Sequence, residues 1–107
     1  MFDDFLKLKS REVIPGFTGR FLHSETMTLA YWEIKKGSIS PEHNHIHEQV
    51  AYVLQGQFEL TVGGKSKVLS PGMIAVVPSN VKHWGKAITD CTVMDVFNPV
   101  REDYKNS

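Results

Sequence analysis

Short runs in which apolar and polar residues alternate recur along the chain, and Gly or Pro separates most of them. In the sharpest example, Phe58, Leu60 and Val62 share one side of the pattern, and the Gly63-Gly64 pair that follows suits the positive φ angles of a tight hairpin. No run combines the length and the period of a helix. The pattern predicts an almost all-β chain with strands at residues 11–14, 17–23, 27–34, 49–54, 57–62, 65–69, 73–77 and 92–97.

The two ends of the chain are less regular. Phe2, Phe5, Leu6 and Leu8 fit either a short amphipathic helix or an edge strand. The final EDYKNS has the composition of a solvated tail. With 107 residues and no linker or repeat between these ends, we expect one domain spanning residues 1–107.

Charge and composition narrow the possible partners. The 12 basic and 12 acidic residues cancel and are scattered, so the chain lacks the basic surface that nucleic acid or an anionic membrane requires. The single cysteine, Cys91, cannot form an internal disulfide, and Asp3 and Asp4 interrupt the start where a secretory signal would be basic and then apolar. The apolar stretches are too short to span a membrane. We expect a soluble cytoplasmic protein.

A cluster of metal-donor side chains lies in the middle of the chain. His43, His45 and Gln49 stand at even separations, so in an extended strand they point to one face, and His83 can join them from a distant strand. Imidazole and carboxamide donors of this mix accept several divalent ions, among them nickel, zinc, iron and manganese. All four donors are neutral and leave the charge of the ion undiminished, which favours a strongly polarising Lewis acid. The cluster predicts one transition-metal ion inside a β-barrel.

Other interpretations of the histidines stay open. They could lie on an exposed strand, although a buried face with this many polar groups must have each group satisfied. His47 has the same parity and fits a ligand, a hydrogen-bond partner of a ligand, or a loop residue. His23 lies apart from both clusters and fits the surface or the rim of a barrel.

The C-terminal stretch TVMDVFNPVRED adds groups suited to a small carboxylated substrate. If Asp95 and Phe97 face inward, they supply an acid/base group and an aromatic wall, and Arg101 supplies a guanidinium that can bind a carboxylate. The opposite orientation is equally compatible with the alternation, because one face of this strand is mixed and the other apolar. Phe97 could also be core, and Arg101 could be an exposed ion-pair residue beside Glu102 and Asp103.

Two segments resemble the two cupin motifs. Residues 37–56 match the first motif through Gly37, His43, His45, Gln49 and Gly56. Residues 72–87 match the second through Gly72, Pro78 and His83. The chain departs from the usual pattern at Gln49, where most cupins have Glu, at Asn80, where Gly is usual, and at Ala87, where Asn is common. The resemblance implies a single-domain cupin with a jelly-roll β-barrel, a fold that hosts many functions.

The combination of HNHIHEQ with the downstream DVFNPVRED resembles the KdgF family of small pectin-degradation cupins. The resemblance implies metal ligands at His43, His45, Gln49 and His83, with Asp95 and Arg101 in catalysis and Phe97 and Arg101 in substrate binding. It also implies a homodimer and the metal-dependent ketonisation of 4,5-unsaturated uronates, small carboxylated sugars from pectin or alginate. Two alternatives stay open, a non-catalytic cupin that senses sugar acids and a metal-dependent dioxygenase.

Overall fold

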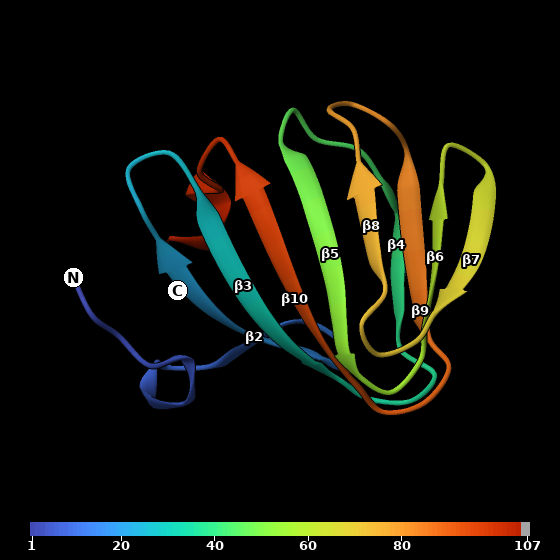
Figure 1. The fold of residues 1–107 in the computed structure, drawn as a ribbon, viewed down its shortest axis with the longest axis horizontal. Helices are drawn as coiled ribbons and strands as arrows, with labels where there is room; N and C mark the ends of the chain where they lie inside the picture. The colour runs from blue at the N-terminus through green and yellow to red at the C-terminus, as the bar shows by residue number, and fades with distance from the viewer. Residues whose placement is uncertain (106–107) are drawn as a thin grey trace.

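The computed structural model describes residues 1–105 as two antiparallel sheets that face each other (Figure 1). The six-stranded sheet has the order β1 (Arg11–Ile14), β2 (Phe17–His23), β3 (Thr28–Ile34), β10 (Cys91–Asn98), β5 (Glu48–Gln55) and β8 (Ile74–Val77). The four-stranded sheet has the order β4 (Ile39–His43), β9 (His83–Ala87), β6 (Phe58–Val62) and β7 (Lys65–Leu69). Two short 3₁₀ helices, η1 (Phe5–Lys7) and η2 (Glu102–Tyr104), flank the strands. The all-β prediction is confirmed.

The predicted hairpin is also confirmed. β6 and β7 pair from Phe58 opposite Leu69 to Val62 opposite Lys65, and Gly63 and Gly64 have φ angles of 55° and 82°. Only residues that tolerate positive φ can close so short a turn at low cost. Local sequence thus determines this part of the four-stranded sheet.

Two strands of the four-stranded sheet were not predicted. β4 contains Pro41 and is mostly exposed, so it shows no alternation. β9 carries Gly85 at its centre, where a side chain would collide with the Phe58 ring of the neighbouring strand. Gly85 therefore lets Phe58 pack against β9. Tertiary contacts, rather than propensity, hold both strands in place.

The single strand predicted across the histidine cluster is wrong. β4 ends at His43 and β5 begins at Glu48, so residues 44–47 form a connection from one sheet to the other. His43, His45 and Gln49 therefore do not share a strand face through even spacing. Their approach results from the crossing between sheets.

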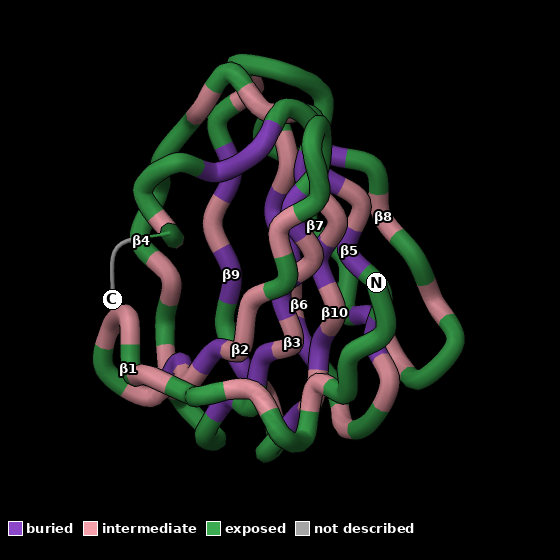
Figure 2. The backbone as a smooth tube through the Cα atoms, turned by 90° about the vertical axis from the view of Figure 1, so that its left-hand side faces the viewer, coloured by how far each residue is buried: buried purple, intermediate pink, exposed green. Residues whose placement is uncertain are grey.

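The core lies between the sheets, where buried residues of facing strands meet (Figure 2). Phe17 makes edge contacts with Trp32 and Phe58, at centroid distances of 6.2 Å and 6.3 Å. Aromatic pairs in this geometry add stability beyond their buried area. Phe17 and Trp32 belong to the six-stranded sheet and Phe58 to the four-stranded sheet, so these rings pack the two sheets together.

Both chain ends pack against the six-stranded sheet. Of the two alternatives for the N-terminal residues, a short helix or an edge strand, only a single helical turn, η1, is present. The Phe5 ring of this turn stacks on Tyr31, and Arg20 donates hydrogen bonds to the carbonyl groups of Leu6 and Leu8. At the other end, the prediction of a solvated tail is wrong for Tyr104, whose ring lies 4.7 Å from that of Phe21. Glu102 and Asp103 are exposed, and residues 106–107 lie outside the described part of the chain.

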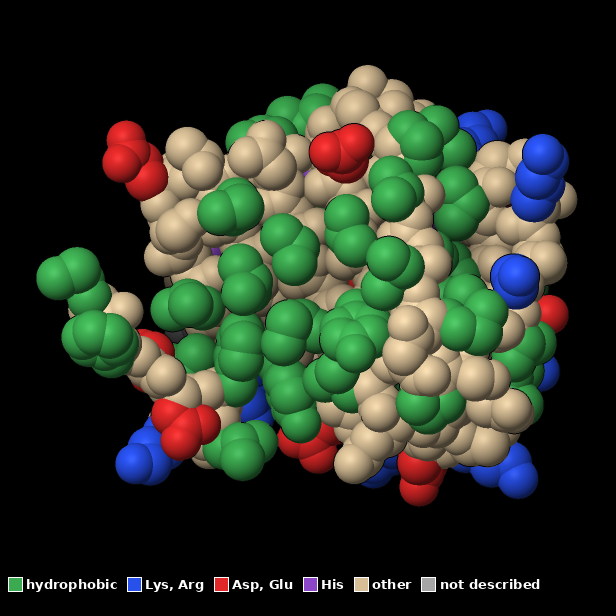
Figure 3. Space-filling view, in the orientation of Figure 1, with side chains coloured by type: hydrophobic (Ala, Val, Ile, Leu, Met, Phe, Trp, Pro, Cys, Tyr) green, Lys and Arg blue, Asp and Glu red, His purple; other side chains and the backbone are tan. Residues whose placement is uncertain are grey.

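The outer face of the six-stranded sheet is largely apolar (Figure 3). Leu22, Tyr52, Ile74 and Val76 are exposed on strands β2, β5 and β8. Contiguous apolar surface of this kind commonly marks a contact with another protein. The homodimer stays a prediction, and this face is one apolar surface on which a second copy could pack.

Among residues 1–105, no helix has the length and apolar character needed to cross a bilayer.

Candidate active site

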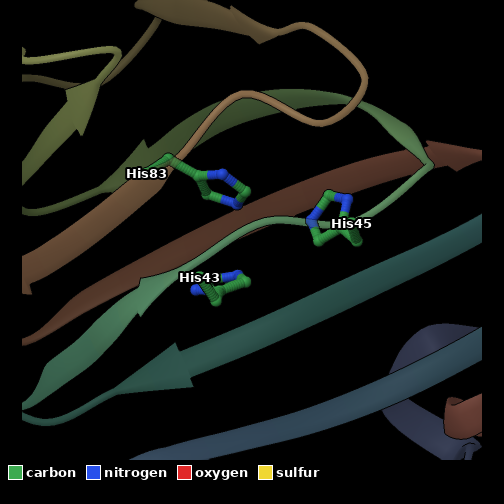
Figure 4. A group of neighbouring side chains, drawn as sticks. All are labelled: His43, His45 and His83. Atoms are coloured by element: carbon green, nitrogen blue, oxygen red, sulfur yellow. The ribbon is translucent and has the colours of Figure 1, made fainter.

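Three histidines converge at one end of the two sheets (Figure 4). His43 ends β4, His83 begins β9 directly opposite it in the strand register, and His45 lies in the connection to β5. One ring nitrogen from each of the three lies within 4.8 Å of the others. Residues that are distant in sequence thus form a compact triad.

Backbone carbonyls fix the orientation of the three rings. The Nδ1 atoms of His43, His45 and His83 lie 2.7–2.9 Å from the carbonyl oxygens of Pro41, His47 and Val81. A carbonyl oxygen can only accept, so each Nδ1 carries the proton and each neutral ring keeps the Nε2 lone pair free. The Nε2 atoms of His45 and His83 are buried and have no hydrogen-bond partner among the described residues.

Burial favours the neutral form of two of these imidazoles, His45 and His83. It lowers the pKa of His45 to about 4, with a further contribution from the nearby positive charge of Arg101. It also lowers the pKa of His83. Neutral imidazoles with unpaired, convergent Nε2 atoms are the form that binds metal. The triad therefore fits a divalent transition-metal ion.

The other two histidines lie outside the triad. The His47 carbonyl accepts the hydrogen bond from His45 Nδ1, and the His47 ring makes edge contacts with the rings of His45 and Phe97. His47 thus orients a triad member through its backbone. His23 is partly exposed on β2 and shares a hydrogen bond with Thr28.

Asp95 faces the interior of the molecule. Along β10 the buried residues alternate with partly exposed ones, and Asp95 belongs to the buried set together with Val93 and Phe97. The outward orientation is therefore wrong. The Trp32 indole Nε1 donates to Asp95 Oδ2 over 3.0 Å.

The environment of Asp95 favours its neutral form more than water does. Burial raises the pKa of this carboxyl to about 6, while Gln49, Trp32 and Arg101 act in the opposite direction. A carboxyl group with a raised pKa can both accept and return a proton near neutral pH. Asp95 thus has the chemistry expected of a general acid/base.

Arg101 is buried, with 8% of its surface exposed, and its position is determined on several sides. Its Nε and Nη2 atoms donate to the two carboxylate oxygens of Asp103 over 3.0 Å and 2.8 Å. The guanidinium also lies 4.7 Å from the Phe97 ring centroid and 4.1 Å from that of Tyr104. The alternative in which Arg101 is an exposed ion-pair residue is correct about its partner, Asp103, but wrong about the exposure of Arg101. The bidentate contact with Asp103 uses Nε and Nη2 and leaves Nη1 free to donate to another group.

These groups line one cavity of about 410 Å³, within the size range of small-molecule sites. Its polar lining includes His43, Gln49, His83, Asp95, Arg101 and Asp103. Its apolar lining includes Phe17, Trp32, Phe58, Leu60, Val93 and Phe97. A donor cluster, a carboxyl group and a guanidinium therefore meet in a partly apolar hollow.

The family model for the cupin domain matches residues 30–97, which contain both histidine segments and all of β10 except Asn98. The chain belongs to the cupin family. Among curated relatives, the pectin degradation protein KdgF of Dickeya dadantii is 31% identical over 83 residues, which cover 76% of each chain. The structure of KdgF from a Halomonas species superposes with a TM-score of 0.91 at 30% identity over 97% of each chain. An RmlC-like cupin from Shewanella frigidimarina gives the same TM-score and identity over 96% of this chain and 94% of its own.

Three residues of this cupin's cavity were not predicted from sequence. Trp32 lies in a predicted strand, and a buried Trp usually needs an acceptor for its N–H, which was the available signal. Asp103 was considered only as a surface partner of Arg101. Tyr104 stands in the predicted tail, and no sequence pattern indicates that its ring covers Arg101.

Gln49 is buried near the start of β5 and opposite Phe97 of β10, and it lines the same cavity as His43 and His83. Its role as the fourth metal donor stays a prediction. We expect Gln49→Ala to weaken metal binding, because a carboxamide oxygen contributes one of four donors. Metal content per chain after extended dialysis measures the effect. Gln55→Ala, at the exposed end of the same strand, serves as the matched control, and equal occupancy in both variants would exclude Gln49 as a ligand.

Proposed function

We propose that this cupin catalyses the metal-dependent ring opening and ketonisation of 4,5-unsaturated uronates to linear 4-deoxy-5-keto-uronates. The observation that carries the proposal is the position of Asp95, a buried carboxyl group in the same cavity as two triad histidines, His43 and His83, and Arg101. The similarity to KdgF, whose name places it in pectin degradation, supports the same substrate class. Uronates from alginate carry the same reacting groups.

The proposed reaction is an isomerisation that moves one proton. The substrate is a cyclic hemiacetal whose ring oxygen is also part of an enol ether. Loss of the proton of the anomeric hydroxyl forms the carbon 1 aldehyde, breaks the bond between carbon 1 and the ring oxygen, and leaves the electron pair on that oxygen. Protonation of carbon 4 then converts the enolate to the 5-ketone. The enzyme must therefore accept a proton at one position and deliver one at another.

Asp95 is suited to both proton transfers. Its raised pKa lets it accept the anomeric hydroxyl proton and return one to carbon 4 without a second acid. Burial also excludes bulk water, which would otherwise compete for the proton. Asp95 alone can therefore carry out both proton transfers of the proposed reaction.

Arg101 and Phe97 are suited to hold the substrate. The free side of the Arg101 guanidinium can donate to the uronate carboxylate, and Asp103 keeps the group oriented for that contact. Phe97 belongs to the buried core, as the alternative from sequence had it, and it also lines the cavity, where its ring can pack against one face of the sugar. His43, His45 and His83, with Gln49, would hold the ion. When bound, a divalent metal such as nickel, zinc, iron or manganese supplies Lewis-acid stabilisation of negative charge on substrate oxygen.

The proposal is tested by mixing the purified protein with an unsaturated uronate monomer under nitrogen and following the loss of conjugated double-bond absorbance. We expect loss well above the rate in buffer alone. A sensor cupin would bind the sugar without faster loss. A dioxygenase would require oxygen and consume it. Either result would contradict the proposal.

Arg101→Lys is expected to raise KM for the uronate by about 10–100-fold, because hydrogen bonds to charged groups contribute about 1.5–3 kcal/mol. Lys keeps the charge but cannot maintain the bidentate contact with Asp103 or the planar stacking between two rings. Steady-state kinetics measures the change. Arg20→Lys, which alters an arginine outside the cavity, is the control. A KM equal to that of the control would remove Arg101 from carboxylate recognition.

A further inference from the structure

We propose that Trp32 is a positioning residue for Asp95, whose Oδ2 it holds so that Oδ1 is the oxygen that exchanges protons with the substrate. The substrate part of this inference rests on the proposed function. The hydrogen bond itself does not, and it can be tested without any substrate.

The strand register brings the indole to the carboxylate. Asp95 of β10 lies directly opposite Ala30 of β3, and Trp32 is two residues further along β3 on the same inward face. The small Ala30 side chain leaves room for the indole to reach across to Asp95. Nε1 lies 3.0 Å from Oδ2, and both residues are buried.

The chemistry of indole distinguishes the two carboxyl oxygens. An indole N–H can donate a hydrogen bond but cannot accept one, so Oδ2 must act as the acceptor whether Asp95 is charged or neutral. The carbonyl oxygen of a neutral acid is a better acceptor than its hydroxyl oxygen, so this hydrogen bond favours placing the proton on Oδ1. Oδ1 is buried and has no hydrogen-bond partner within 3.5 Å among residues 1–105, although the nearby Gln49 side chain also stabilises the charged form of this carboxyl group. Oδ1 is thus the free oxygen in a cavity-lining carboxyl group.

Packing fixes the direction of the indole. Trp32 makes edge contacts with Phe21 and Tyr104 at centroid distances of 5.4 Å and 5.9 Å. Gly19 is its register partner on β2, and a Cβ there would lie 2.8 Å from the Trp32 ring and 2.6 Å from Phe21. The absence of a side chain at Gly19 therefore provides the space that the indole occupies. A ring held on these sides keeps its N–H aimed at Oδ2.

The first test needs no substrate. The chain has two tryptophans, so its amide correlation spectrum contains two indole N–H signals, and Trp32→Phe identifies the Trp32 signal by its loss. We expect Asp95→Ala to move the Trp32 indole proton upfield, because its charged acceptor is removed, while the Trp84 signal stays in place. An unmoved Trp32 signal would overturn the hydrogen bond.

The second test is kinetic. We expect Trp32→Phe to lower kcat by about 10–100-fold, the usual effect of losing a group that orients a reacting residue, with KM and metal content unchanged. Because Phe also leaves unfilled space, a second variant replaces Trp32 with benzothienylalanine, which keeps the bicyclic shape and lacks the N–H. It is expected to show the same loss of kcat.

Tyr31→Phe, on the outward face of the same strand, is the control and should keep the wild-type kcat. Wild-type kcat in the benzothienylalanine variant would overturn the positioning role. If the wild-type protein itself fails to ketonise uronates, the proposed function is wrong, while the spectrum still decides whether Trp32 holds Asp95.

Discussion

Asp95→Asn is expected to abolish ketonisation, lowering kcat by about 10²–10⁴-fold, the usual contribution of a general acid/base. The amide keeps the size of the carboxyl group, and its oxygen can still accept the Trp32 N–H, so the fold should be retained. It cannot, however, take the anomeric hydroxyl proton or return one to carbon 4. The loss should appear in the absorbance assay, and the metal content should equal that of the wild type.

Asp90→Asn provides the matched control. Asp90 is exposed and accepts a hydrogen bond from the Lys36 backbone N–H, a contact that an Asn oxygen can also make. This variant should keep full activity. If Asp95→Asn is equally active, Asp95 has no part in the mechanism.

His83→Ala is expected to remove both metal and activity. His83 is a buried member of the triad, and its loss leaves two imidazoles, of which His43 is exposed. With neutral donors only, no remaining ligand charge compensates for the missing bond. Elemental analysis after dialysis should fall from about one ion per chain to background, and ketonisation should fall with it.

His23→Gln controls for the loss of an imidazole elsewhere, because Gln can keep a hydrogen bond to Thr28. It should retain metal and activity. In the wild type, a chelator should remove activity and an added divalent ion should restore it. Full activity in the metal-free protein would show that the triad is not needed for the reaction.

The fold could be predicted wherever local chemistry determines it. The β6–β7 hairpin follows from alternation and two glycines, and the alternation of β10 correctly separates the faces of that strand. Sequence could not decide which face is inward, because a mixed face suits either solvent or a cavity. That choice depends on the pairing of β10 with β3 and β5, which only the assembled sheet provides.

The predicted metal-donor residues do lie near one another, but the reason given for their proximity was partly wrong. Even spacing on one strand does not bring His43, His45 and Gln49 together, since the chain crosses between sheets at residues 44–47. Their combination of types was the reliable signal. Trp32 was missed because its contact with Asp95 joins residues 63 positions apart, which no local pattern reveals.

The most direct test of the account is a proton NMR time course of an unsaturated uronate with the enzyme in deuterated water. The account predicts that the carbon 4 vinyl signal decays much faster than in buffer, and that deuterium first enters one of the two carbon 4 positions of the ketone, because Asp95 delivers it from one side. Decay at the buffer rate, or equal labelling of both positions from the first time point, would contradict it.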